Sequence, residues 1–195
     1  MGTIPPSQLT MAILTGGQGT RLGGLEKGLL RKDGQTLVER LLGLELPRAE
    51  DLLVTDRPQP YRFVAGRARV VPDAVAAKGP ASGLVAALQA ARTPWVLVLP
   101  CDQPDLSAGV LEPLLEPGAE VRCYRLGGYL EPLPGLYRGE LGERWRPLLE
   151  GAPGLQRLVT GVKLEALEAG PAVAVALRGV NTPEQMRALG VDGGS

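Results

Sequence analysis

The apolar run Trp-Val-Leu-Val-Leu, from Trp95 to Leu99, limits what this chain can fold into more than any other segment does. A strand with one face in solvent alternates apolar and polar residues, whereas a strand buried on both faces is apolar throughout. Parallel strands are covered by helices on both faces and contain such continuous runs. The segment therefore predicts a central strand of a parallel sheet with helices on either side.

Strand-like and helix-like patterns alternate along the first two-thirds of the chain. We expect strands at Leu9 to Thr15, Asp51 to Thr55, Arg69 to Val71, Trp95 to Leu99 and Glu120 to Leu126. We expect helices at Thr36 to Leu46, with Thr36 as N-cap, at Ala81 to Ala91 and at Ser107 to Leu115. This alternation predicts an α/β fold of three layers, Rossmann-like, with a mostly parallel central sheet and helices on both faces.

The last third of the chain has a weaker pattern. We expect strands at Leu133 to Tyr137, Val162 to Leu167 and Ala172 to Leu177. We expect helices at Glu140 to Leu149, Leu155 to Thr160 and Thr182 to Leu189, the last with Pro183 at its first helical position. The chain contains no repeat and no linker. We therefore expect a single domain over residues 9–190, between an N-terminal extension (1–8) and a C-terminal tail (191–195).

Composition excludes several classes of protein. The chain has 195 residues, which fits one domain, and its 21 acidic residues balance its 21 basic ones. Without a basic excess, nucleic acid is not an expected partner. No segment approaches the run of about 20 apolar residues that a membrane helix needs, and no secretory segment precedes the first strand. We expect a soluble cytoplasmic protein with no membrane partner.

The chain has no histidine and only two cysteines, Cys101 and Cys123. Catalysis by Ser-His-Asp or Cys-His groups is therefore excluded, and structural zinc is not expected. Cys101 is expected to be a small buried residue. The chemistry must depend on carboxylates, Lys, Arg, backbone amides and a hard metal ion.

The stretch from Leu14 to Lys27 is rich in glycine and contains two cations, Arg21 and Lys27, but a single acid. Successive glycine N–H groups can form a concavity that binds anions. The Walker pattern fails because Glu26 precedes Lys27, and the dinucleotide pattern fails because Leu22 stands where glycine is needed. We therefore expect a polyphosphate-binding loop of another kind, with a flexible surface loop as the alternative.

Asp102 follows the most apolar strand, and ligands of open parallel sheets bind beyond the carboxyl ends of the strands. Mg²⁺ prefers one or two carboxylates together with phosphate oxygens and water, so Asp102 is a candidate Mg²⁺ ligand. The alternative is an aspartate that caps the next helix, but Asp105 or Ser107 is better placed for capping.

Asp73 ends the third expected strand, at the same edge of the sheet. Its carboxylate could bind Mg²⁺, ribose hydroxyls or a base, or it could be a turn residue. Gly79 and Gly83 flank the start of the next expected helix, and a helix N-terminus favours an anionic ligand.

The absence of histidine also indicates a reaction class. When one phosphate attacks another, the nucleophile is already ionised at neutral pH and needs no general base. Catalysis then consists of aligning two anions and offsetting their charge with Mg²⁺, Lys and Arg. The chain has these parts.

These motifs, in this order, resemble the molybdenum cofactor guanylyltransferases, which are nucleotidyltransferases of the sugar-nucleotide-transferase fold. The matching segments are spread over nearly the whole chain. They are Leu14 to Lys27 with Gly28-Leu29-Leu30, Val71-Pro72-Asp73, Gly79 to Gly83, Pro100-Cys101-Asp102-Gln103-Pro104, Glu131 to Tyr137 and Val180 to Glu184. The first motif is shared by many nucleotidyltransferases, and the combination is more selective.

The resemblance implies transfer of GMP from GTP to molybdenum-molybdopterin, with Mg²⁺ as cofactor and pyrophosphate as the second product. It also implies transient contact with molybdenum cofactor biosynthesis proteins or molybdoenzymes. The implied nucleotide-binding residues are Leu14, Thr15, Gly16, Gly17, Lys27, Asp73, Gly83 and Asp102. Arg21 and Lys27 would offset phosphate charge, Asp102 would hold Mg²⁺, and Asn181 would lie on the pterin or metal side.

Three positions depart from the family pattern: Thr15 replaces alanine, Thr55 replaces asparagine, and Gly179 replaces asparagine. The pterin pocket stays open among Tyr124, Arg125, Tyr129 and Arg157. A cytidylyltransferase, a sugar-phosphate nucleotidyltransferase and a non-catalytic GTP-binding regulator are the alternative functions.

Overall fold

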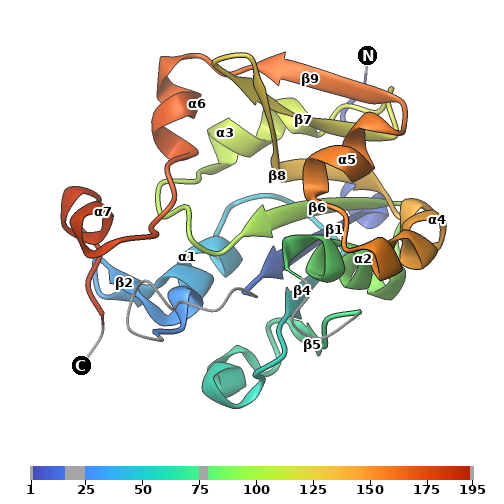
Figure 1. Cartoon of the computed structure of the whole chain (residues 1–195). Helices are drawn as coiled ribbons and strands as arrows, with labels where there is room; N and C mark the ends of the chain where they lie inside the picture. Colours follow the sequence, from blue (N-terminus) through green and yellow to red (C-terminus); the bar gives the residue numbers. More distant parts are fainter. Residues whose placement is uncertain (1, 16–24, 75–78, 194–195) are drawn as a thin grey trace.

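The computed structural model describes residues 2–15, 25–74 and 79–193. Its main sheet has seven strands in the order β5-β4-β1-β6-β8-β7-β9 (Figure 1). The strands are β1 (Leu9–Leu14), β4 (Glu50–Val54), β5 (Arg69–Val71), β6 (Trp95–Pro100), β7 (Val121–Leu126), β8 (Tyr129–Arg138) and β9 (Leu164–Glu168). β8 is antiparallel to both of its neighbours, and the other strand pairs of this sheet are parallel. The predicted mostly parallel sheet is confirmed.

The predicted run WVLVL lies at the centre of this sheet as β6, between β1 and β8. Val96 to Leu99 are completely buried, because helices cover both faces. On one face Leu97 and Leu99 pack with α1 (Leu37–Leu42), α3 (Ala108–Leu111) and α6 (Pro171–Ala176). On the other face Val96 and Val98 pack with α2 (Pro80–Ala90), α4 (Leu141–Trp145) and α5 (Leu155–Thr160). Three layers result.

Several expected elements are shorter than predicted, because glycine and proline end them. α1 begins after the N-cap Thr36, whose side chain forms a capping box with Glu39, and it ends at Gly43. Pro113 and Pro147 fall where the third and fourth helices continue as the 3₁₀ turns η5 (Glu112–Leu114) and η6 (Arg146–Gly151). Proline lacks the N–H that an α-helical bond needs, so the tighter turn follows.

The expected strand at Ala172 to Leu177 is wrong, because this segment forms helix α6. Its alternating Ala and Val residues are typical of a strand. Gly170 and Pro171 instead start a helical turn, and Ala176 and Leu177 become buried beneath the sheet. β8 also begins earlier than predicted, since Gly127 and Gly128 both have positive φ angles (57° and 86°) and close a hairpin with β7.

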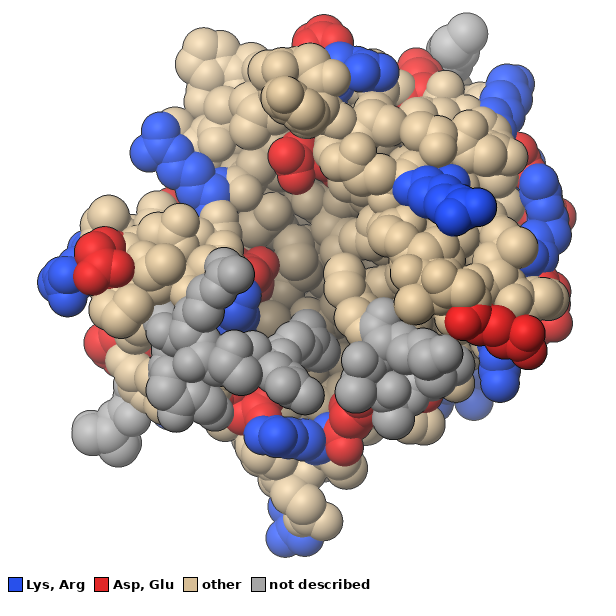
Figure 2. Space-filling view, in the orientation of Figure 1, with Lys and Arg blue, Asp and Glu red and all other residues tan. Residues whose placement is uncertain are grey.

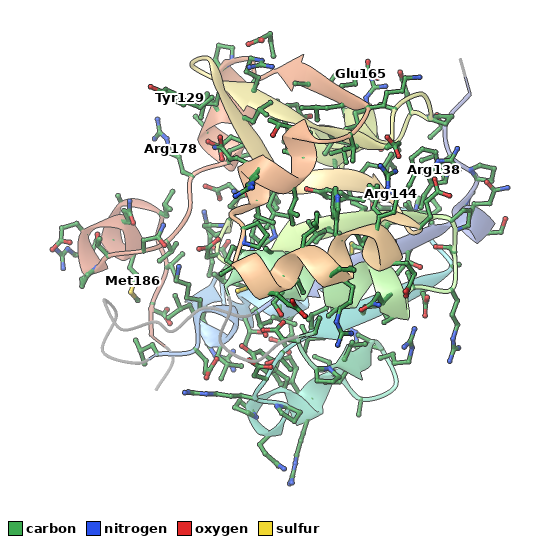
Figure 3. All side chains as sticks on the ribbon, turned by 45° about the vertical axis from the view of Figure 1, so that its right-hand side comes forward. Tyr129, Arg138, Arg144, Glu165, Arg178 and Met186 are labelled. Carbon is green, nitrogen blue, oxygen red and sulfur yellow. The ribbon has the colours of Figure 1, made fainter. Side chains whose placement is uncertain are left out.

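The C-terminal part of the chain folds back onto the segment after Lys27. Helix α7 (Pro183–Ala188) has the predicted Pro183 at its start and a capping box between Thr182 and Gln185. A small apolar cluster of Leu30, Leu37, Val180 and Val191 joins the two segments, and Met186 packs against it. Figure 3 shows Met186 projecting from α7 toward the body of the protein. This arrangement brings residues from opposite ends of the chain to one place.

Next to this cluster, β2 (Arg31–Lys32) and β3 (Gln35–Thr36) form a separate two-stranded sheet, and Arg31 bridges to Asp192. Near the other end of the chain, Ile4 is buried and its N–H donates to the carbonyl of Leu115. The boundaries predicted at residues 9 and 190 stay a prediction. Among the helices that the structure describes, each is too short or too polar to cross a membrane.

Candidate active site at the carboxyl edge of the sheet

The side chains of Lys27, Asp102 and Asn181 meet at one point beyond the carboxyl ends of β1 and β6. The Nζ atom of Lys27 donates to Oδ2 of Asp102 at 2.8 Å and to Oδ1 of Asn181 at 2.6 Å. The Lys27 and Asp102 side chains are 19% and 22% exposed, so the ion pair is sheltered but open to solvent on one side. The structure thus brings together three of the predicted site residues.

Backbone hydrogen bonds fix the positions of the two segments that carry Asp102 and Asn181. The N–H of Cys101 donates to the carbonyl of Leu14 at 3.1 Å, which extends the β1–β6 ladder up to the residue before Asp102. The N–H of Val180 donates to the carbonyl of Asp102 at 2.8 Å, which holds the segment of Asn181 against this turn. The carboxylate and the amide therefore lie on segments that are tied to the sheet and to each other.

Lys27 starts the 3₁₀ turn η3 (Lys27–Leu29), and close packing beneath Gly28 sets its position. A Cβ atom at Gly28 would lie 2.8 Å from the hydroxyl of Tyr61 and 2.8 Å from Cγ2 of Val38. Those distances leave no room for a side chain. Tyr61, from the 3₁₀ segment η4 (Gln59–Val64), is 1% exposed and supports the turn from below. Tyr61 could not be predicted from the sequence, because nothing near it in sequence signals this contact.

The Lys27 turn carries a second ion pair, and a third lies on the strand that follows it. Arg57 pairs with Glu26 at 2.9 Å, one residue before Lys27. Lys32 pairs with Asp105, the residue that we considered as a cap for the following helix. Ser107 does occupy the N-cap position of α3, but its side chain makes no capping hydrogen bond. Asp102 takes no part in capping, which leaves its carboxylate to Lys27.

Asp73 lies half-buried after β5, close to the first turn of α2. Its Oδ1 atom has no hydrogen-bond partner in the part of the chain that the structure describes, and it would lie 3.1 Å from a Cβ at Gly83. Burial raises the pKa of the Asp73 carboxyl to about 6, and the negative charge of Asp56 adds to the rise. An unpartnered acceptor beside a helix N-terminus can receive hydroxyl or N–H donors from a ligand.

Because the folded protein binds the Asp73 proton more tightly than the unfolded chain does, this group costs stability as pH rises. The stability that protonated Asp73 contributes is fully present below about pH 4 and is lost as the pH rises through about 6. We expect Asp73→Asn to raise the free energy of unfolding at pH 8 by about 1–2 kcal/mol and to leave it unchanged at pH 4. Urea unfolding at both pH values measures this.

Asp56→Asn is the companion variant for this test, because it removes only the neighbouring charge. It should give a smaller gain over the same pH interval. A gain for Asp73→Asn that is equal at pH 4 and pH 8 would contradict the assignment.

The other predicted nucleotide-binding residues divide into two groups. Leu14 and Thr15 lie at the end of β1, where the Leu14 carbonyl accepts from Cys101 and the Thr15 N–H donates to Val54. The Thr15 hydroxyl also donates to the Val54 carbonyl, at 3.0 Å, and Thr15 is 4% exposed. These groups support the sheet edge. Gly16, Gly17 and Arg21 lie outside the described residues.

Two further positions are resolved by their contacts. Thr55, which replaces the family's asparagine, is buried, and its hydroxyl accepts from the N–H of Arg57 at 3.1 Å. Its side chain shapes the loop after β4. Cys101 is 4% exposed as predicted, and burial raises the pKa of its thiol, so it is an inert packing residue.

The four pterin candidates differ strongly in exposure. Tyr124 is 2% exposed and its hydroxyl donates to the carbonyl of Val110 at 2.5 Å, so it cannot face a ligand. Arg125 pairs with Glu168. Tyr129, which is 74% exposed, and Arg157 remain candidates, and Figure 3 shows Tyr129 extending from the β7–β8 hairpin into solvent.

The donor set at Asp102 fits a magnesium ion. Among the described residues no group of three or more His, Cys, Asp or Glu side chains is arranged around a common point. A single carboxylate suits Mg²⁺, which keeps water and takes its other ligands from phosphate. The Lys27 ammonium, held between these two oxygens, shows that the place accepts a cation. Figure 2 shows that the face of the molecule drawn there is hollowed near its centre.

The chain is similar to known proteins over most of its length. Residues 11–169 match the model of the MobA-like NTP transferase domain. A molybdenum cofactor guanylyltransferase from Pseudomonas paraeruginosa is 36% identical over 190 residues, which cover 93% of each chain.

Two solved structures share the fold. One is the molybdopterin-guanine dinucleotide biosynthesis protein A from Archaeoglobus fulgidus, with a TM-score of 0.76, 21% identity and coverage of 93% of this chain and 96% of that one. The other is a nucleotidyl transferase from Methanothermobacter thermautotroptrophicus, with a TM-score of 0.71, 20% identity and coverage of 94% and 96%. From the matched domain and the 36% identity to the Pseudomonas paraeruginosa relative, we conclude that this chain belongs to the MobA-like NTP transferase family.

Proposed function

We propose that this protein transfers GMP from GTP to molybdenum-molybdopterin, giving molybdopterin guanine dinucleotide and pyrophosphate. The observation that carries the proposal is the pairing of the Lys27 ammonium with the Asp102 carboxylate at 2.8 Å, at the edge of the sheet where β1 ends. The name of the Pseudomonas paraeruginosa relative supports guanine as the base and the molybdenum cofactor as the acceptor.

In the proposed reaction, an oxygen of the pterin's terminal phosphate forms a bond to the α-phosphorus of GTP. The bond from that phosphorus to the bridging oxygen of pyrophosphate breaks, and pyrophosphate leaves with the electron pair. No proton moves, which suits a chain without histidine. Lys27 and Arg21 offset the charge on the α-phosphate and on the leaving group, and Asp73 receives donors from the nucleoside.

Asp102 would hold the Mg²⁺ ion, which supplies charge neutralisation between the phosphates when it is bound. Beside this carboxylate, the Asn181 amide oxygen accepts from the Lys27 ammonium. Because the Lys27 ammonium and the Asp102 carboxylate are in contact, both can address one triphosphate. The proposed partners of the protein are GTP, the molybdopterin cofactor and, transiently, proteins of molybdenum cofactor biosynthesis or molybdoenzymes.

An assay that crosses nucleotides with acceptors tests the proposal. The protein and MgCl₂ are incubated with each of the four nucleoside triphosphates, and with molybdenum-molybdopterin, a sugar 1-phosphate or no acceptor. Released pyrophosphate is then measured. We expect release only from GTP with the pterin.

The other outcomes of this assay identify the alternatives. Release from CTP with the pterin would indicate a cytidylyltransferase, and release with a sugar phosphate would indicate a sugar-phosphate enzyme. GTP binding without pyrophosphate from any acceptor would indicate a regulator and would overturn the proposal.

A further inference from the structure

The amide of Asn181 makes a contact that the proposed reaction does not explain. Its Oδ1 atom accepts from Nζ of Lys27 at 2.6 Å, while the same Nζ donates to Asp102 at 2.8 Å. The Lys27 ammonium therefore points toward two protein oxygens. The ammonium must leave at least one of these oxygens before it can bind a triphosphate.

Asn181 is a fixed acceptor. On its N-terminal side, the N–H of Val180 donates to the carbonyl of Asp102 at 2.8 Å. On its C-terminal side, the N–H groups of Asn181 and Thr182 both donate to Oε1 of Gln185, at 2.7 and 3.1 Å, within the start of α7. Because the backbone is bonded on both sides, the main chain at Asn181 is held in place independently of Lys27.

The charges at this point allow one cation at a time. Asp102 contributes one negative charge, Lys27 one positive charge, and the Asn181 amide none. A metal ion on Asp102 and the ammonium on the same carboxylate repel each other across a short distance, so the two compete. A neutral amide holds the lysine more weakly than a second carboxylate would, so releasing the ammonium costs less free energy.

Resting on the proposed function, we infer that Asn181 is a positioning residue for Lys27. Together with Asp102 it forms a resting place that the ammonium leaves when a divalent cation takes the carboxylate. Lys27 is then released toward the phosphates at the moment when the metal arrives. Asn181 lies outside residues 11–169, the part of the chain that the domain model matches.

Gly179 keeps the space beside this resting place open. A Cβ atom at residue 179 would lie 3.2 Å from Nδ2 of Asn181 and 3.6 Å from Cγ of Asp102. A larger side chain would press on both partners of the lysine. The glycine thus leaves room for the exchange of one cation for another.

The first experiment measures binding of Mn²⁺ alone, without nucleotide, by the electron paramagnetic resonance of the free ion. Wild-type protein is compared with Lys27→Met, which keeps most of the side-chain volume but removes the ammonium. We expect Lys27→Met to bind Mn²⁺ at least about tenfold more tightly. The matched control is Lys32→Met. Lys32 lies on the neighbouring strand β2, and the substitution removes an ammonium that pairs with Asp105. Equal tightening in both variants, or none in Lys27→Met, would overturn the inference.

The second experiment separates positioning from direct metal binding. If Asn181 acts through Lys27, Asn181→Leu frees the ammonium and tightens Mn²⁺ binding by about threefold, and it has no effect in a Lys27→Met background. If Asn181 is instead a metal ligand, Asn181→Leu weakens Mn²⁺ binding in both backgrounds, and the inference fails. Asn181→Ser, which is too short to reach the ammonium, gives the same test should leucine disturb the start of α7.

A spectroscopic readout reports on the lysine itself. The chain has four lysines, at 27, 32, 78 and 163, so ¹⁵N-labelled lysine gives few ammonium signals. The Lys27 ammonium signal should be visible in the wild type, because its protons are hydrogen-bonded, and it should broaden in Asn181→Leu. An unchanged signal would contradict the positioning role.

These measurements use neither GTP nor pterin. If Lys27→Met tightens Mn²⁺ binding but the nucleotide assay yields no GMP transfer, the proposed function fails and the cation exchange stands. If GMP transfer is found but Mn²⁺ affinity does not respond to Lys27→Met, the function stands and the exchange is wrong.

Discussion

Replacing Lys27 with alanine is expected to lower the rate of GMP transfer by about a thousandfold. The ammonium is the described cation that contacts Asp102, and removing one preorganised charge from a transfer site costs about a hundredfold to a thousandfold. Initial rates of pyrophosphate release with saturating GTP and pterin measure the effect. The thermal unfolding temperature should change little, because Lys27 and Asp102 are both partly exposed.

Lys32→Ala is the control for this loss. Lys32 has the same charge, a similar exposure and its own carboxylate partner, Asp105. We expect it to retain nearly all of the wild-type rate. If Lys27→Ala transfers GMP as fast as Lys32→Ala does, the role assigned to Lys27 is wrong.

Replacing Asp102 with asparagine is expected to raise the Mg²⁺ concentration for half-maximal rate by about tenfold or more, and to lower the rate at saturating Mg²⁺ by about a hundredfold. Asparagine has the same shape, and the hydrogen bond between Val180 N–H and the carbonyl of residue 102 belongs to the backbone. The fold should therefore persist, and the change should be limited to the charge. A magnesium titration of the transfer rate measures both effects.

Asp105→Asn is the matched variant for this titration, since Asp105 is close in sequence and paired with Lys32. Its magnesium dependence should equal that of the wild type. A wild-type titration curve in Asp102→Asn would show that the carboxylate at 102 is not the metal ligand.

The sequence was sufficient for the parts of the fold that follow from local patterns. Trp95 to Leu99 indicated the central strand, because two buried faces require a wholly apolar run. Thr36 was predicted as an N-cap and Pro183 as the first residue of a helix, and Thr36 and Thr182 form capping boxes in the structure. The prediction of a strand at Ala172 to Leu177 was wrong, because its small residues fit a strand or a helix equally. Only packing against the sheet decides which of the two forms.

The site was predictable only where a motif marked it. Asp102 and Lys27 each lie beside a recognisable pattern, but their contact joins residues 75 positions apart. The contact of Lys27 with Asn181 spans 154 positions. Tyr61 escaped notice altogether, because its role depends on the close approach of Gly28. Such contacts follow from tertiary packing, which no local pattern encodes.

The large separation between Lys27 and Asn181 has a consequence during synthesis. During translation the N-terminal part of the chain leaves the ribosome first. Lys27 therefore emerges long before Asn181, which is 154 residues further along, has been added to the chain. Until α7 closes over Leu30 and Leu37, the lysine lacks one of its two partners. The translating protein therefore reaches the arrangement described here only after nearly the whole domain has left the exit tunnel.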